Sequence, residues 1–461
     1  MTLKNIRIIS TATILPRNHH QNEFAQRMEL TPWDLQLLLV NPTQRGLLFH
    51  KPNNSGFIQH LEATLSKTLD IFYPLAGRLS LIQNDDNTSS FFLHCNGEGV
   101  DFVHAVVDDG ITVTDILNPL NVPHHILHSL FPLNGILNLH GISKPLLAVQ
   151  VTELEDGIFI ACTMNHSVAD GTSFWNFFNT WSQISRAGVD DDDDDVVFKQ
   201  FEVSQVTPPL VFDRQFLEGV VELPVRIPFS NDQIRTLMVM RSTDQPALEH
   251  RMFHFSKERI AELKAKANAE MGSDKISSLQ ALLGHLWVSV TRNRNLNADQ
   301  EVVYMIMLGL RNRIEPKLPE QYLGNCATAG VVKTTAGELL KKGSGWAASQ
   351  INKMIASQTS AEAKKRLEGW AKNPILVSAG QVIETVKVVF TGSSHRFDVY
   401  GNDFGWGRPI AVRTGPGNAS DGKLTVFAGA EEGTIDFEAC FLPETTQAMA
   451  DDAEFMKTVD V

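Results

Sequence analysis

A histidine followed four residues later by an aspartate, and then by a glycine, is the pattern in this chain best suited to chemistry. The three residues are His166, Asp170 and Gly171. An apolar run over 158–164 precedes them and aromatic residues at helical spacing follow over 174–181, which predicts a strand, a tight turn and a helix. Because the pKa of histidine lies near neutrality, an imidazole held where a buried strand ends can accept a proton and return it.

The aspartate of this pattern admits two roles. On a helix, Asp170 lies close enough to His166 to orient the imidazole, as the carboxylate of a serine hydrolase triad does. Alternatively, Asp170 points away from the imidazole and fixes the shape of the site. The spacing is common in proteins and the chain contains 15 histidines, so a second signal is needed before a function can be inferred.

That second signal is a motif near the C-terminus. The stretch that contains Asp403, Gly405, Trp406 and Gly407 reads Asp-Phe-Gly-Trp-Gly, a composition that suits a rigid, bulky loop and not proton transfer. Together the two motifs resemble the signatures of the plant BAHD acyltransferases, and the resemblance covers nearly the whole chain, including Pro-Leu-Ala-Gly-Arg at 74–78. It implies transfer of an acyl group from an acyl-coenzyme A thioester to a hydroxyl or amine of a plant specialised metabolite.

The resemblance also implies roles for the residues around the histidine. In relatives this histidine is the general base, which makes His166 the catalytic candidate. An arginine after a buried strand pairs with the aspartate in relatives, which implies that Arg311, or alternatively Arg313, pairs with Asp170. Burying both charges together offsets a desolvation cost that either would meet alone. Asp170, Gly171 and Arg311 are therefore expected to shape the site, and the second motif to be structural.

Ser393 and His395 precede the second motif. Relatives carry Ser or Thr at the first position and Trp at the second, both beside the reacting acyl group. Ser393 is the candidate donor to the oxyanion of the tetrahedral intermediate. His395 replaces the Trp, so we interpret it as a wall of the pocket, with a second titratable group as the alternative. Acyl specificity therefore does not transfer from the members that carry Trp.

Lys275, Ser277 and Ser278 are the candidates for binding coenzyme A. They stand at the start of a predicted helix, where free amides and hydroxyls form an anion site. In relatives this segment lies near the ribose 3′-phosphate. The alternative is that Ser277 only caps the helix. No permanently bound cofactor is expected, because acyl-coenzyme A acts as a co-substrate.

Several other residues that could do chemistry are assigned structural roles. His124 and His128 share a helix face, but no further ligand follows at matching spacing, so no metal is predicted. Cys162 lies on an apolar strand and is expected to be inert. The stretch 30–34, Leu-Thr-Pro-Trp-Asp, is interpreted as packing. The cysteines are too scattered for a disulfide framework or a metal knuckle and are expected to be reduced: Cys95, Cys162, Cys326 and Cys440.

Composition excludes several classes of protein. The chain has 461 residues with 43% hydrophobic and 20% charged residues, which is typical of a soluble globular protein. The net charge is −13 without any basic cluster, so nucleic acid is not an expected partner. Neither a secretion signal nor an apolar run of about 18 residues is found, which predicts a cytoplasmic protein that does not span a membrane. A monomer is expected.

The length favours two domains. The resemblance implies an α/β fold like that of chloramphenicol acetyltransferase, with two similar mixed domains, each a sheet core with flanking helices, and a solvent channel between them. We place an N-terminal domain at 1–189 and a C-terminal domain at 221–461. The linker over 190–220 carries six consecutive aspartates and prolines. A segment near 375–400 is predicted to cross back to the N-terminal sheet.

Two functions of other classes stay open. The histidine could serve a lyase or elimination reaction on a bound conjugate without coenzyme A, an alternative that His395 favours. The chain could also be a catalytically silent binding protein, which the intact His166 argues against. Release of coenzyme A as free thiol separates the three functions.

Overall fold

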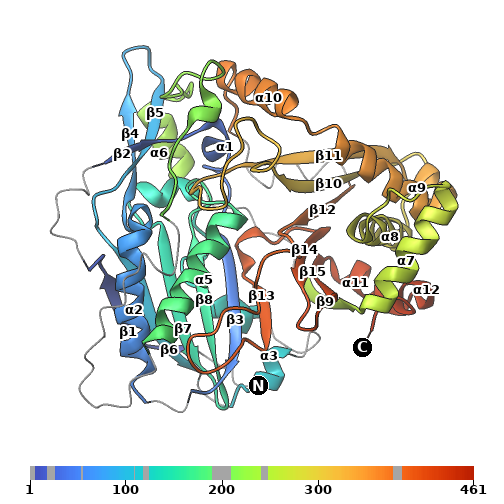
Figure 1. Ribbon diagram of the computed structural model, residues 1–461, viewed down its shortest axis with the longest axis horizontal. Coiled ribbons are helices and arrows are strands. Elements are labelled where there is room, and N and C mark those ends of the chain that lie inside the picture. The colour runs from blue at the N-terminus through green and yellow to red at the C-terminus, as the bar shows by residue number, and fades with distance from the viewer. Residues whose placement is uncertain are drawn as a thin grey trace.

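The computed structural model describes residues 6–17, 26–52, 55–107, 110–117, 124–188, 209–239, 248–376 and 387–460. They form two lobes that lie side by side, each a β-sheet covered by helices (Figure 1). The predicted two-lobed α/β fold is therefore confirmed.

The first lobe is built on a six-stranded sheet. Its strands, in spatial order, are β1 (Ile6–Ile14), β6 (Val100–Val107), β7 (Leu147–Glu153), β8 (Gly157–Met164), β3 (Thr43–His50) and β13 (Ala411–Thr414). Every residue of β8 is buried, because both faces of the sheet are covered. Helices α2 (Phe57–Ile71) and α5 (Gly171–Ala187) pack on one face, and α3 (Val113–Leu117) and α4 (His124–Ser129) on the other.

Smaller elements complete this lobe and join it to the second. A three-stranded sheet contains β2 (Arg27–Glu29), β5 (Ser89–His94) and β4 (Arg78–Gln83). The short helices are α1 (Pro32–Leu35), η2 (Tyr73–Ala76), η3 (Asn138–Ile142), η5 (Gln215–Leu217), α6 (Asn231–Val239) and η6 (Pro416–Asn418).

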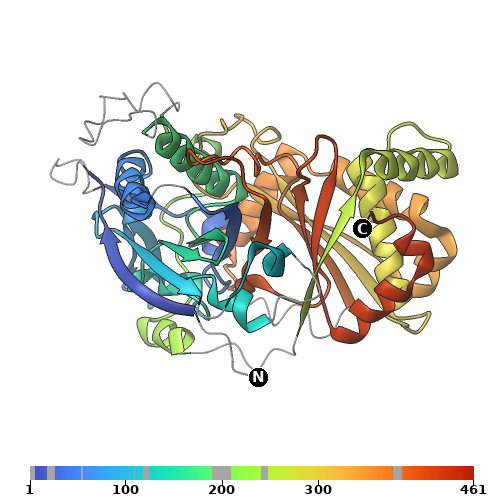
Figure 2. The same ribbon diagram turned by 90° about the horizontal axis from the view of Figure 1, so that it is seen from below.

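The second lobe contains another six-stranded sheet. Its strands are β11 (Ala327–Thr335), β10 (Glu301–Gly309), β12 (Lys387–Gly392), β14 (Lys423–Ala428), β15 (Ile435–Phe441) and β9 (Glu249–Phe255). Its helices are α7 (Lys257–Met271), α8 (Ser278–Asn293), α9 (Ala336–Ala356), α10 (Ser360–Lys372), α11 (Pro443–Asp451) and α12 (Ala453–Met456). Helices α7, α8 and α9 cover the face that points away from the first lobe (Figures 1 and 2).

Strand β13 belongs to the sheet of the first lobe although its neighbours in sequence lie in the second. It pairs antiparallel with β3, with Val412 opposite Leu47. The predicted crossing near 375–400 is too early, because β12 still pairs with β10 and β14 in the second sheet. Strands β12 and β13 are both short, so local sequence does not tell which sheet each strand joins. The aspartates at 190–195 lie outside the described residues, and the domain limits remain a prediction.

Candidate active site

The turn that carries His166 lies between β8 and α5. Asp170 caps α5 by accepting a hydrogen bond from the Ser173 N–H at 3.0 Å. Hydrogen bonds to the backbone N–H and carbonyl of the partly buried His166 hold the residue in place. Its N–H donates to Oδ1 of Asn138 at 2.8 Å, and its carbonyl accepts from Nδ2 of Asn325 at 2.7 Å. Asn138 belongs to η3 in the first lobe and Asn325 precedes β11 in the second, so both lobes position the histidine.

The surroundings of the His166 imidazole favour its neutral form. Burial lowers the pKa of His166 below its ordinary value, and the nearby Arg45 guanidinium lowers this pKa further. Asp170 and the backbone carbonyls of His166 and Ala169 act in the opposite direction without reversing the shift. A neutral imidazole has a free lone pair at neutral pH, which is the state that a general base requires.

Asp170 is engaged by Arg311 and not by the imidazole. Nη1 of Arg311 donates to Oδ2 of Asp170, and Nη2 donates to Oδ1 at 2.9 Å, a bidentate pair. Besides the N–H of Ser173, the backbone N–H of Cys326 also donates to Asp170, to Oδ2 at 3.1 Å. Burial opposes ionisation of Asp170, but these donors outweigh it, and its pKa lies below the ordinary value. The structure therefore contains the ion pair that the resemblance implies, and it favours a shaping role over a triad role.

The alternative partner, Arg313, lies elsewhere. Its side chain is exposed and donates to the carbonyls of Ile355 and Gln358 at 3.0 and 3.3 Å. Arg311 in contrast is buried, and its Nη2 also donates to the carbonyls of Tyr322 and Gly324. The ion pair thus anchors the stretch 322–325, Tyr-Leu-Gly-Asn, beside the histidine turn.

The interpretation of stretch 30–34 as packing is incomplete, because Asp34 supports the histidine turn. Oδ1 of Asp34 accepts from both the backbone N–H and Nδ2 of Asn325, at 3.0 and 2.9 Å. Oδ2 of Asp34 accepts from the N–H and hydroxyl of Thr31, both at 2.8 Å, in a capping box at the start of α1. Asp34 therefore orients the amide of Asn325, which in turn holds the carbonyl of His166. The Thr-Pro-x-Asp spacing of a capping box was the signal in the sequence.

Ser393 and His395 follow directly after β12. Ser393 has a φ of 69°, which is uncommon for a residue with a side chain, and such strain is frequent at functional sites. Its Oγ and the Nδ1 of His395 are buried without a hydrogen-bond partner among the described residues. Burial, and then Arg396, lower the pKa of His395.

The start of α5 joins this segment to the histidine turn. A Cβ atom on Gly171 would lie 3.1 Å from the ring of Phe397. The absence of a side chain at Gly171 therefore lets the segment after Ser393 approach the helix that begins at Asp170.

The Asp-Phe-Gly-Trp-Gly loop packs at the other end of α5. Oδ1 of Asp403 accepts from the N–H groups of Gly405 and Gly407 at 2.9 and 3.0 Å, and both glycines have φ above 100°. The ring of Phe404 lies 4.9 Å from that of Trp181 on α5, centroid to centroid. This geometry fits a structural role for Asp403, Gly405, Trp406 and Gly407.

The coenzyme A candidates lie at the start of α8 in the second lobe. Ser277 forms a capping box with Gln280, in which each side chain accepts from the other residue's N–H, at 3.3 and 2.9 Å. Ser278 is the first residue of the helix, and Lys275 is exposed. The geometry shows the capping role and leaves the Lys275 ammonium accessible to an anion.

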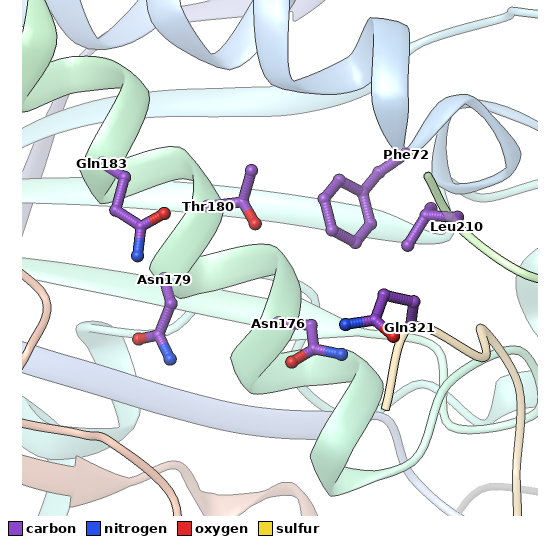
Figure 3. Close-up of a pocket in the computed structure, with 7 residues that line it drawn as sticks. All are labelled: Phe72, Asn176, Asn179, Thr180, Gln183, Leu210 and Gln321. Carbon is purple, nitrogen blue, oxygen red and sulfur yellow. The ribbon is translucent and has the colours of Figure 1, made fainter. Parts of the chain in front are cut away.

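Two other features carry no acid or base chemistry. Burial raises the pKa of the Cys162 thiol well above its ordinary value, so it is a poor nucleophile. The hollow in Figure 3 lies along α5 and does not include His166. Its lining residues are all neutral: Phe72, Asn176, Asn179, Thr180, Gln183, Leu210 and Gln321.

Comparisons with known proteins agree with this fold. TRI101 of F. sporotrichioides, solved with coenzyme A and T-2, superposes with a TM-score of 0.70 at 17% identity, over 94% of this chain and 99% of that chain. The two lobes therefore define a chloramphenicol acetyltransferase-like fold.

Sequence relatives give the family. The profile of the Transferase family matches residues 4–456. An uncharacterized acetyltransferase of Arabidopsis thaliana is 41% identical over 460 residues, covering 99% of both chains. The BAHD acyltransferase DCR of the same plant is 30% identical over 451 residues, covering 94% of this chain and 88% of that protein. The chain belongs to the BAHD acyltransferases. Within the described ranges, no helix has the length and apolar character needed to cross a membrane.

Proposed function

We propose that this protein is a cytoplasmic, monomeric enzyme that moves an acyl group from acyl-coenzyme A to a hydroxyl or amine of a plant specialised metabolite. His166 acts as the general base. The observation that carries the proposal is the geometry of the His166 turn. Hydrogen bonds from both lobes hold this turn, and burial keeps the imidazole of His166 neutral. Acyltransferase relatives that cover nearly the whole chain support it.

The reaction needs a single proton carrier. Nε2 or Nδ1 of His166 accepts the proton of the acceptor hydroxyl or amine while that atom forms a bond to the thioester carbonyl carbon. The carbonyl becomes an oxyanion, towards which the Ser393 hydroxyl donates a hydrogen bond. When the intermediate collapses, the carbon–sulfur bond breaks and the imidazolium returns its proton to the sulfur of coenzyme A. No covalent acyl-enzyme is required, in keeping with the inert thiol of Cys162.

The remaining residues bind or position. Lys275, Ser277 and Ser278 receive the 3′-phosphate of coenzyme A at the start of α8. Asp170 and Arg311 keep the histidine turn in shape. General-base assistance contributes about 10²- to 10⁴-fold, so the rest of the acceleration comes from holding two substrates together.

An elimination reaction is the second candidate, and His395 favours it. Its Nδ1 has no hydrogen-bond partner among the described residues, so it is available as a second acid or base. Elimination from a conjugate would release product without any free thiol, which distinguishes it from acyl transfer.

A screen of several acyl-coenzyme A thioesters against pooled plant alcohols and amines tests the proposal. Free thiol and acylated product are followed together, by colorimetry and mass spectrometry. The variant His166→Ala should lose about 10²- to 10⁴-fold in kcat while its affinity for coenzyme A is unchanged. His50→Ala, which changes an exposed histidine at the end of β3, serves as the matched control and should retain most of the activity. A near-normal rate of His166→Ala would refute the general-base role, and ligand binding without turnover would indicate a binding protein.

A further inference from the structure

The two faces of the second sheet differ in chemistry. Residues that pack under α7, α8 and α9 are apolar, among them Leu424 and Phe437. On the opposite face, Lys423 lies beside Cys440, and Thr425 beside Glu438, because directly paired residues of antiparallel strands share a face. These side chains are nonetheless buried, since this face meets the first lobe. We refer to it as the inner face.

Arg45 of β3 approaches the inner face from the first lobe. It pairs with Cys162 of β8, the strand that leads into His166, and its guanidinium lies 5.8 Å from the ring centroid of Phe427 on β14. Arg45 is also close enough to His166 to lower the pKa of the imidazole. These contacts place the guanidinium between the sheets and near the reacting atoms.

No described carboxylate forms a direct ion pair with Arg45. Burial lowers the pKa of Arg45 to about 10, and the charge of Glu438 opposes this shift without reversing it. The one hydrogen bond of the Arg45 side chain among the described residues is donated by Nη1 to the carbonyl of Gln44 at 2.6 Å. A partly buried guanidinium with one of its five N–H groups so engaged has donors left for a ligand. Buried charges in proteins are ordinarily paired, and an anionic ligand would give Arg45 the direct partner that the described residues do not provide.

The carboxylates nearest to this place are already engaged. Glu438 accepts from the N–H and hydroxyl of Thr414, at 2.8 and 2.6 Å, and from Nδ1 of His250 at 2.9 Å. Although burial opposes it, contact with Cys440 and Glu438 raises the pKa of His250 to about 10, so this pair is neutral as a whole. Asp436 is likewise held by His254 at 2.6 Å.

Two further basic residues, Lys423 and Arg413, lie close to Arg45. Burial, and then the charge of Arg45, lower the pKa of Lys423 to about 7. Arg413 of β13 adds a further cation, whose donors are taken by the carbonyls of Val412, Ile116 and Leu117. Basic residues of both lobes therefore lie near Arg45, while the acidic residues that act on them, Glu438 and Asp436, are hydrogen-bonded to histidines.

We propose that Arg45 binds a carboxylate carried by one of the two substrates, next to His166. This inference rests on the acyltransferase function proposed above. The pantetheine arm is uncharged near its thioester, and the phosphates of coenzyme A are assigned to the start of α8. An anion at Arg45 must then belong to the acyl chain or to the acceptor. The planar guanidinium, with paired donors, matches a carboxylate in geometry.

Matched substrate pairs test this inference and identify which substrate carries the anion. For the acyl arm, succinyl-coenzyme A is compared with butanoyl-coenzyme A. For the acceptor arm, 4-hydroxycinnamate is compared with its amide. Each pair is measured by thiol release and by thermal shift with the full chain, using wild type, Arg45→Gln, Arg45→Lys and the exposed control Arg235→Gln.

In one of the two pairs, the wild type should prefer the substrate that carries the carboxylate. For that substrate, Arg45→Gln should lower kcat/KM about 30-fold or more, whereas kcat/KM for the neutral substrate of the pair should change less than about threefold. Arg45→Lys should recover part of the loss, since it keeps the charge, and Arg235→Gln should match the wild type. Equal loss for both members of each pair, or no preference in either arm, would overturn the proposal. Absence of thiol release from every pair would instead count against the acyltransferase function, and the thermal shifts would still decide whether Arg45 binds carboxylate. Should Arg45→Gln not fold, Arg45→Lys and the wild-type preferences decide.

Discussion

Replacing Arg311 with methionine should destabilise the protein in a manner that depends on pH. The change leaves the carboxylate of Asp170 buried, with only the N–H groups of Ser173 and Cys326 as donors. Removing one partner of a buried ion pair costs about 3–5 kcal/mol. Because two donors remain on Asp170, we expect a value near the lower end, about 3 kcal/mol at neutral pH.

The sign of the pH effect follows from the pKa of Asp170. In the wild type this pKa lies below its ordinary value, so the pair contributes stability above the unfolded pKa of about 3.9, and that contribution is lost as the pH falls through the folded pKa. Without Arg311, burial is left to raise the folded pKa. The variant is then penalised most at neutral pH, and the difference from the wild type shrinks as Asp170 becomes protonated.

Urea unfolding followed by tryptophan fluorescence, at about pH 7 and about pH 5, measures this difference. Arg313→Met is a matched control, because Arg313 lies in the same loop but is exposed and pairs only with carbonyls. The double variant Asp170→Asn, Arg311→Met should recover part of the stability, since it leaves no buried charge. If Arg311→Met unfolds at the same urea concentration as the wild type, or if its loss is the same at both pH values, the reasoning about this pair is wrong.

Three further predictions concern the histidine turn and coenzyme A. Asn325→Ala removes hydrogen bonds to Asp34 and to the His166 carbonyl, so urea unfolding should show that the free energy of unfolding falls by about 2–4 kcal/mol. Because the histidine is then less well positioned, kcat should fall about 10- to 100-fold, with KM for coenzyme A unchanged. An unaltered kcat would show that Asp34 and Asn325 do not position the histidine. The rate constant kcat/KM should rise with pH through a pKa below 6.5 and then level off, because protonated His166 cannot accept a proton; a midpoint above 7 would contradict the depressed pKa. Lys275→Gln should raise KM for acetyl-coenzyme A about 3- to 10-fold and leave KM for the dephospho form unchanged, whereas equal effects on both would exclude contact with the 3′-phosphate.

The sequence predicted the parts of the site that are encoded locally. The apolar run before His166 and the aromatic spacing after it are properties of single segments, and they predicted β8, the turn and α5 correctly. Arg311 required the resemblance, because nothing in its own neighbourhood indicates a partner 141 residues away.

What was missed depends on contacts between distant segments. Asp34 and Asn325 are separated by 291 residues, and only the folded structure shows that they are hydrogen-bonded to each other next to His166. The residues that follow Arg45 are apolar and predict only a buried strand. Nothing in them indicates that the Arg45 side chain lies between two sheets. The crossing strand was placed too early for the same reason, since which sheet a short apolar strand joins is decided by its partner and not by its residues.

Because β13 comes late in the sequence, the sheet of the first lobe can be completed only near the end of translation. Until Ala411–Thr414 leaves the ribosome, the β3 edge opposite to β8 has no strand to pair with. An open edge recruits strands from other molecules, so nascent or prematurely terminated chains that stop before residue 411 are exposed to aggregation and to capture by chaperones. The histidine-bearing half of this protein is therefore not a self-sufficient unit, and attempts to express it alone should fail unless the missing strand is supplied.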